Sequence, residues 1–170
     1  LTLYGRNGNS RIADPADPRK IFSWLICETR DDKGNAILYE YRQEDETGVD
    51  LTQANERNRS RTANRYIKRI RYGNQRTRLS GGRRPVFLSA DQLEATHWLF
   101  EVVFYYGEDH YQLVPLDNSR PSLEQRQRIQ AAAEPLNPSW SVRPDPFSAY
   151  RAGFEVRSYR RCQRVLMLHH

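Results

Sequence analysis

The sequence predicts a mainly β protein, an antiparallel sheet of hairpins with about five to seven strands and one or two short helices. Aromatic and β-branched residues gather in short runs that are separated by Gly, Pro, Asn and Asp. The chain contains ten Tyr, six Phe and three Trp, so it lacks the aromatic-poor composition of disordered proteins. Only one segment carries a clear helix-start signature. These observations favour strands over helices along most of the chain.

The region from Ile12 to Asp45 contains the strongest local signal, which is that of a β-hairpin. Its two runs, Ile21–Arg30 and Ala36–Gln43, are rich in aromatic and β-branched residues, as strands are. Acidic residues can open the turn between them, and a glycine there can adopt the positive φ that a short hairpin loop needs. The expected turn residues are Asp31, Asp32, Gly34 and Asn35.

Further strands are expected near residues 66–72, 85–88, 97–106, 111–114 and 154–168. The run His97–Tyr106 is apolar on both faces apart from Glu101, so it is expected at the centre of the sheet. In the last run the apolar phase shifts part-way. A long bulged strand explains this shift, and an amphipathic helix is the alternative.

Alternate residues of these strands define the expected core, because every second side chain of a strand points to the same face. The expected core residues are Phe22, Trp24, Ile26, Ile37, Tyr39, Tyr41, Ile70, Tyr72, Trp98, Phe100, Val102 and Phe104. Cys27 lies among apolar neighbours and is expected as a buried free thiol, although a bridge to Cys162 stays open.

One helix is expected at residues 123–133. Ser122 and Gln125 form a capping-box pattern at its start, and Pro135 stops it. Residues 50–65 are a weaker candidate for a second helix, since they begin with capping residues but contain almost no apolar side chain.

The overall composition limits the class of protein. With 170 residues the chain has room for one domain, and its 38% of hydrophobic residues make a thin core. No apolar run reaches the roughly 18 residues of a membrane span, and no signal-peptide pattern opens the chain. The chain starts at Leu1 rather than Met and stops at His170 directly after an apolar run. We therefore expect a single fragment of a larger protein.

Charge is segregated along the chain. Arg57–Arg84 contains eleven basic residues and no acid, whereas residues 31–56 contain eight acids and two basic residues. One interpretation is a nucleic-acid surface, because clustered arginines favour phosphates. The other is cross-strand pairing of Glu40 or Glu44 with Arg69 or Arg71. We favour pairing, because strands that are neighbours in sequence usually pair in space.

Motifs for catalysis or metal binding are weak. Glu44 and Glu46 form a Glu-x-Glu pair, which in some transferases positions a ribose, but no Ser-Thr-Ser strand accompanies it. None of the four histidines (His97, His110, His169 and His170) has a second ligand at metal-binding spacing. The sequence therefore predicts no catalytic residue, no cofactor, no metal and no enzymatic activity.

Several segments together resemble one family. They are Arg11–Pro15, Arg19–Leu25, Asp31–Ile37, Asn64–Asn74, Arg143–Ser148, Gly153–Arg157 and Val165–Met167. The set is similar to the SpvB domain family, the amino-terminal region of the B component of insecticidal toxin complexes, shared with a plasmid virulence protein of Salmonella. The match departs from the family pattern at Tyr105, where an Asp is expected, and over residues 111–137.

The resemblance implies a secreted bacterial toxin component with a structural role. In that family this region joins a β-propeller and YD-repeat sheets in a hollow β-rich shell that encloses a cytotoxic polypeptide. The implied partners are the remainder of the same chain and, for the whole protein, the toxin complex A and C components. Nucleic acid is a less favoured partner, and this segment is not expected to insert into a membrane. An ADP-ribosyltransferase fragment is the second alternative, although in the virulence protein that activity belongs to a separate carboxy-terminal domain.

Overall fold

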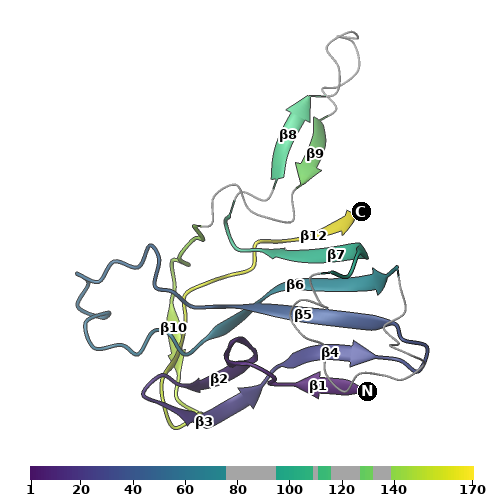
Figure 1. Ribbon diagram of the computed structural model, residues 1–170. Helices are drawn as coiled ribbons and strands as arrows, with labels where there is room; N and C mark the ends of the chain where they lie inside the picture. Colours follow the sequence, from purple (N-terminus) through teal and green to yellow (C-terminus); the bar gives the residue numbers. More distant parts are fainter. Residues whose placement is uncertain (76–94, 109–110, 116–126, 132–138) are drawn as a thin grey trace.

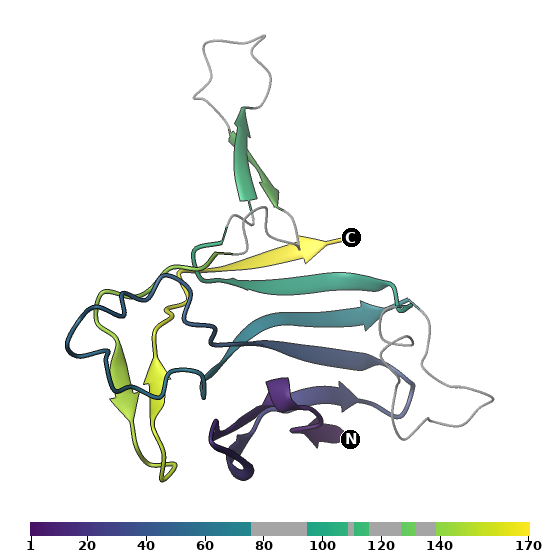
Figure 2. The ribbon, with the colours of Figure 1, turned by 60° about the vertical axis from the view of Figure 1, so that its left-hand side comes forward.

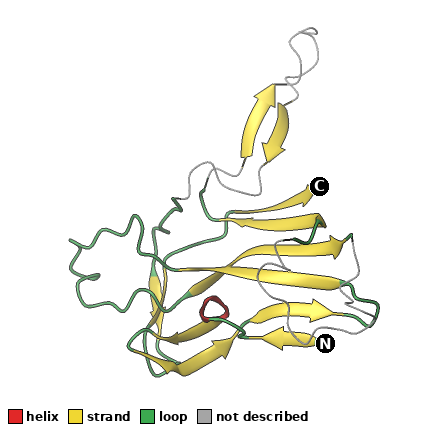
Figure 3. Ribbon diagram, in the orientation of Figure 1, coloured by secondary structure: helices red, strands yellow, loops and turns green. Residues whose placement is uncertain are grey.

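The computed structural model describes residues 1–75, 95–108, 111–115, 127–131 and 139–170. In these residues the fold is mainly β, as predicted from the sequence. Within the described ranges there is no α-helix, and one 3-10 turn, η1 (Gly8–Ser10), is present (Figure 3). None of the described residues forms a helix with the length and apolar character needed to cross a membrane.

An antiparallel six-stranded sheet forms the body of the molecule, with its strands in the order β1-β4-β5-β6-β7-β12. Figure 1 shows these strands side by side, from β1 near the amino terminus to β12 at the carboxyl terminus. Their bounds are Thr2–Tyr4, Ile26–Arg30, Ala36–Gln43, Arg65–Asn74, Trp98–Tyr105 and Arg164–His169. β7 therefore lies between β6 and β12 rather than at the centre of the sheet.

Three two-stranded antiparallel sheets complete the described strands. They are β2 (Arg11–Asp14) with β3 (Asp17–Trp24), β8 (Tyr111–Pro115) with β9 (Gln127–Ala131), and β10 (Phe147–Ala149) with β11 (Val156–Ser158). Figure 2 shows the long loop between β5 and β6 running beside the β10–β11 hairpin. That loop and hairpin carry most of the buried ion pairs described below.

The run Ile21–Arg30 differs from the expected single strand. It breaks at Leu25, so that β3 pairs with β2 and only β4 pairs with β5. Hydrogen bonds hold the break, because the Leu25 amide donates to the Ser10 carbonyl while its own carbonyl accepts from the Gly5 amide, both at 2.8 Å. As a result Phe22 and Trp24 leave the main sheet and lie at the surface, 48% and 55% exposed, instead of in the core.

The last run, residues 154–168, also divides. Instead of one bulged strand it forms β11 and β12, which belong to different sheets. Between them Tyr159 and Arg160 are buried. The shift in apolar phase that the sequence shows marks this break.

The expected helices are absent where the structure describes the residues concerned. Residues 127–131 form β9, which pairs with β8 along its whole length, so strand pairing outweighs the local capping signal. Residues 50–65 form turns up to the start of β6; the Asp50 side chain accepts hydrogen bonds from the Thr52 amide and hydroxyl and closes one of them. The rest of the 123–133 helix and the expected strand at 85–88 lie outside the described residues.

The register of the main sheet separates an apolar face from a charged one. Directly paired residues share a face. One row runs through Ile37, Tyr72, Phe100 and His169, and the next through Tyr39, Ile70, Val102 and Met167. We call this side the apolar face; it consists of Ile37, Tyr39, Tyr41, Ile70, Tyr72, Phe100, Val102, Phe104, Val165 and Met167.

The expected core residues of the main sheet lie mostly on this apolar face, and the structure leaves them only half-buried. Trp98 is buried, whereas intermediate exposure is found for Ile26, Ile37, Tyr39, Tyr41, Ile70, Tyr72, Phe100, Val102 and Phe104. Some of the buried apolar side chains of the sheet, among them Leu38 and Val103, lie on the opposite face. That face also buries Glu28 and Glu101. Charge was therefore an unreliable marker of exposure, because the buried acids are paired.

Candidate functional site

The predicted hairpin turn joins β4 to β5. Gly34 adopts φ 89°, and the Asp31 carboxylate accepts hydrogen bonds from the amides of Lys33 and Asn35, both at 2.9 Å. The Asn35 side chain donates to the same carboxylate at 2.6 Å and lowers the pKa of Asp31. Asp32 is exposed within the turn. These contacts are local, so they give the turn a structural role.

The charged face of the sheet carries a ladder of ion pairs. Glu40 pairs with both Arg69 and Arg71, and Arg69 Nε lies 2.7 Å from Glu101 Oε1. His170 Nε2 lies within hydrogen-bond distance of the same acid, 3.1 Å from Glu101 Oε2. The cross-strand pairing expected for Glu40 is therefore present across β5, β6 and β7.

Much of the described part of the basic block Arg57–Arg84 is paired in the same way. Arg59 contacts Glu155 at 3.3 Å, Arg61 contacts Glu46 at 3.1 Å, and Lys68 contacts Glu108 at 2.9 Å. Together with Arg69 and Arg71 these residues face acids of the same chain. This arrangement opposes the nucleic-acid interpretation, because a phosphate would have to displace an internal carboxylate from each of them.

Glu44 and Arg160 form the most deeply buried pair. Both side chains have no exposed surface, and they are separated by 116 residues in the sequence. Arg160 Nε lies 2.9 Å from Glu44 Oε2, and a second nitrogen contacts Glu44 Oε1. The pair fixes the start of the β5–β6 loop to the segment after β11. Glu44 was expected to pair with Arg69 or Arg71 instead, so the sequence assigned the wrong partner.

Trp140 packs between two arginines beside this pair. The Arg42 guanidinium lies 3.9 Å from the Trp140 ring centre, and that of Arg160 lies 4.4 Å away. The indole Nε1 donates to Asp45 Oδ1 at 2.7 Å. The contacts with Arg42 and Asp45 join the 139–160 region to the end of β5 and the loop that follows it, so cation–π attraction and hydrogen bonding support the same junction.

Glu56 makes a second junction between the same two regions. Its carboxylate accepts hydrogen bonds from Arg157 and from the Tyr159 hydroxyl. Burial raises the pKa of Glu56, but these hydrogen bonds outweigh burial, so its pKa lies below the usual range. We call Glu44, Glu56 and Glu155, with Arg160, Arg157 and Arg59, the carboxylate clamp.

Glu108 is a further buried acid, at the end of β7. Its side chain has no exposed surface and contacts Lys68 at 2.9 Å and Arg42 at 3.2 Å. The Tyr106 amide also donates to it at 3.0 Å. Burial raises the pKa of Glu108, but Lys68 and the Tyr106 amide outweigh burial and hold the pKa below its usual range.

The Glu-x-Glu pair does not converge on one site. Glu44 points to Arg160 in the interior, whereas Glu46 adopts φ 63° and pairs with Arg61. Among the described residues no group of three or more His, Cys, Asp or Glu side chains could hold a metal ion. Cys27 and Cys162 are both free thiols, half-buried and exposed respectively.

Comparison with known proteins identifies the family. A family model described as SpvB, Salmonella virulence plasmid 65kDa B protein, matches residues 1–170. The chain belongs to the SpvB family. Mono(ADP-ribosyl)transferase SpvB of Salmonella typhimurium strain 14028s is 35% identical to it over 170 residues, and so is that of Salmonella choleraesuis strain SC-B67. The chain spans 25% of the length of these curated relatives.

Solved structures extend the similarity of this SpvB-family chain to toxin complexes. The N-terminal domain of effector protein SpvB from Salmonella typhimurium strain LT2 is 36% identical, with a TM-score of 0.76; the match covers 100% of this chain and 47% of that one. A chain of the TcdB2-TccC3 crystal structure is 32% identical, with a TM-score of 0.71 and coverage of 99% and 7%. A chain of the Photorhabdus luminescens Tc holotoxin pore is 30% identical, with a TM-score of 0.67; the match covers 99% of this chain and 7% of that one.

In this SpvB-family chain, sequence reasoning missed the carboxylate clamp. The signal was present in part, because the acid-rich stretch 31–56 has more acids than its own basic residues can neutralise. The arginines at 157 and 160 lie more than 90 residues further along, where sequence proximity does not indicate a pair. Trp140, in a proline-rich segment, gave no strand or helix pattern at all.

Proposed function

We propose that this chain is a non-enzymatic structural segment of a secreted bacterial toxin complex B component. It forms part of the wall of the β-rich shell that encloses and delivers a cytotoxic polypeptide. The single observation that carries the proposal is the near-complete match of the chain to chains in the TcdB2-TccC3 and Tc holotoxin structures, at 32% and 30% identity. Its partners are then the remainder of its own polypeptide and, at the level of the whole protein, the toxin complex A and C components.

The use of charge in the chain supports a wall role. Glu44, Glu56 and Glu155 are buried in ion pairs within the chain. Groups held in this way rigidify a junction between two regions of the chain, and they are not available to bind a substrate. A rigid β segment whose charged side chains pair with one another is consistent with a role in the wall of a shell.

The proposal is tested with the longer polypeptide that carries this segment, assembled with its C-type component. We expect Glu44→Gln to loosen the wall, so that the enclosed polypeptide is digested faster by an added protease and reaches fewer target cells. Asp145→Asn, in a surface pair with Arg143, is the matched control and should leave both readouts unchanged. Equal protection and delivery by all three proteins, with the segment shown to be loosened, would refute the wall role.

A second candidate is an amino-terminal segment of an ADP-ribosyltransferase effector, which the name of the 35%-identical Salmonella relatives favours. A role for Glu44 in such chemistry is opposed by its complete burial against Arg160. We expect the isolated chain to release no nicotinamide from NAD. Hydrolysis that is lost in Glu46→Gln but kept in Asp145→Asn would favour the transferase instead.

A further inference from the structure

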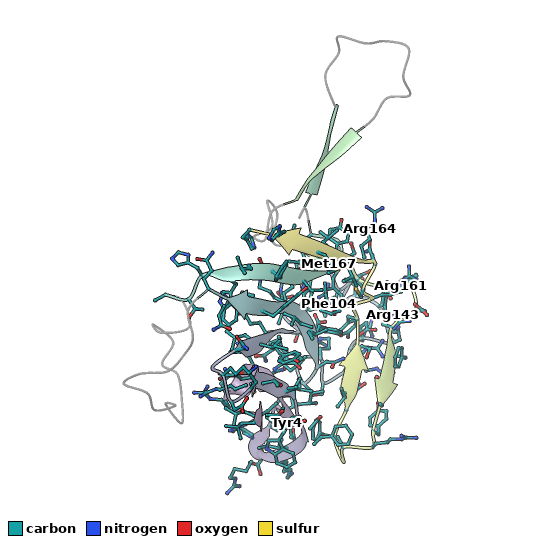
Figure 4. All side chains as sticks on the ribbon, turned by 90° about the vertical axis from the view of Figure 1, so that its right-hand side faces the viewer. Tyr4, Phe104, Arg143, Arg161, Arg164 and Met167 are labelled. Carbon is teal, nitrogen blue, oxygen red and sulfur yellow. The ribbon has the colours of Figure 1, made fainter. Side chains whose placement is uncertain are left out.

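The apolar face continues to the edge of the sheet without losing its apolar character. On the last strand, β12, Val165 and Met167 are 55% and 74% exposed. They pair directly with Phe104 and Val102 of β7, so they extend the apolar rows to the outermost strand. Figure 4 shows Phe104 and Met167 close together on these neighbouring strands.

Aromatic stacking makes this face a stiff platform. The Tyr72 and Phe100 rings stack with centroids 5.1 Å apart, and the Phe100 and His169 rings stack at 5.0 Å. The paired rows that cross the face contain no Asp, Glu, Lys or Arg. A contiguous apolar surface of this kind marks an interaction site in soluble proteins.

The backbone of β12 offers a second, independent feature. It pairs with β7 on one side, and no strand lies on its other side within the described residues. Its register with β7 is regular from Arg164 to His169, without a bulge that would twist the edge away from a partner. Soluble proteins protect such edges, because an open edge templates another strand.

The length of the relatives indicates what covers this surface. The whole chain matches only 47% of the solved SpvB N-terminal domain, so more than half of that domain's chain lies outside the matched region. We propose that the apolar face and the β12 edge dock a further β segment of the same polypeptide, with apolar side chains at alternate positions. This segment would add a strand to β12 and lay its own apolar side over Met167 and Val165. The inference rests on the proposed function only in treating this chain as part of a larger wall.

The test places the same substitution in two contexts. One is the isolated 170-residue chain. The other is a chimera in which this chain replaces its matching part in the Salmonella SpvB N-terminal domain. We expect Met167→Glu to be nearly neutral in the isolated chain, where the side chain is already exposed, and to lower the thermal midpoint of the chimera by several degrees. Leu51→Glu, in the β5–β6 loop and 50% exposed, is the matched control and should be neutral in both.

Hydrogen exchange of the unsubstituted proteins gives a second readout. Every other amide of β12 points to the open edge, so these amides should be slowed in the chimera relative to the isolated chain. Equal exchange and a neutral Met167→Glu in both contexts would overturn the proposal. So would an isolated chain that is a dimer and becomes a monomer on Met167→Glu, because a second copy would then be the occupant. Neither readout involves an enclosed polypeptide, so this inference and the wall role can fail separately.

Discussion

At the scale of single residues, many charged side chains of this protein form ion pairs with other residues of the same chain. Glu44 and Arg160 have no exposed surface, yet each is matched by the other and by further hydrogen bonds. A buried pair of this kind adds little net stability compared with apolar packing, but removal of one partner leaves an uncompensated charge in the interior. The cost of a substitution there depends on burial more than on charge itself.

Glu44→Gln tests this directly. It keeps the shape of the side chain and removes its charge, so we expect the free energy of unfolding to fall by about 3–5 kcal/mol. Urea denaturation of the isolated chain measures it. Asp145→Asn, which breaks an exposed pair, should cost no more than about 1 kcal/mol. A loss of similar size in both variants would show that the Glu44 site is open to solvent.

Gly107 is a position where the backbone itself limits the sequence. Its φ is +106°, and an added Cβ would lie 2.9 Å from Ser141 Cβ and 3.0 Å from the Ser141 amide nitrogen. Gly107→Ala should therefore destabilise the protein by about 1–3 kcal/mol in urea denaturation. Gly8→Ala is the control, since no atom lies within 4 Å of its added Cβ. Equal effects at both positions would contradict the strained geometry at Gly107.

At the scale of elements, the β5–β6 loop is held to the β10–β11 hairpin by acids with depressed pKa values. The pKa lies below its ordinary value in Glu56 and Glu155, which join these two elements, because hydrogen bonds to the carboxylates outweigh burial. The same holds for Glu108, which joins β5 and β6 to the end of β7. A depressed folded-state pKa gives stability that is present above the unfolded-state pKa and is lost as pH falls through the folded value.

We therefore expect a constant free energy of unfolding between about pH 7 and 5.5, and a steep loss below about pH 4.5. Urea denaturation at a series of pH values measures the profile. Glu56→Gln, which removes one of the titrating groups, should flatten the loss. A marked decline between about pH 7 and 5.5 would contradict the assignment of these acids as the titrating groups.

The elements that sequence reasoning predicted well are those with local causes. Ala36–Gln43 became β5 with the same bounds, because its turn and its alternating pattern lie within a few residues. The breaks that divide the predicted strands at Leu25 and at residues 159–163 were missed, because residues distant in the sequence determine them. Leu25 forms hydrogen bonds with Ser10 and Gly5. Arg160 pairs with Glu44. The prediction of a helix at 123–133 was wrong for residues 127–131. A capping pattern is a local signal, and it carries no information about the strand β8 with which these residues pair.

At the scale of the whole molecule, the net charge of +6 overstates the positive surface that is available to a partner. We expect the dissociation constant for short single-stranded or duplex oligonucleotides to exceed about 100 µM at physiological salt, which corresponds to weak binding. Fluorescence anisotropy at low and physiological salt measures it. Tight binding with a steep salt dependence would restore the nucleic-acid interpretation of Arg57–Arg84.

The same scale explains why the candidate site could be predicted only in part. The segregation of acids and bases along the chain was visible, and it led to the pairing of Glu40 with Arg69 and Arg71. The family could also be recognised from the sequence, because the segments that carry the resemblance occur in the same order as in the family. It did not show which sheet face is buried, since the aromatic side chains expected in the core lie on the half-exposed apolar face while the acids of the opposite face are buried.

The 116-residue separation of Glu44 and Arg160 also sets a schedule for biosynthesis. At about 5–20 residues per second, Glu44 leaves the ribosome roughly 6–23 s before its arginine does. The β4–β5 hairpin has local contacts and can form during that interval, whereas the loop after β5 stays hydrated and accessible to proteases. The nascent chain therefore cannot close this junction until Arg160 has emerged, and a ribosome that stalls before adding Arg160 releases a product whose β5–β6 loop lacks this partner.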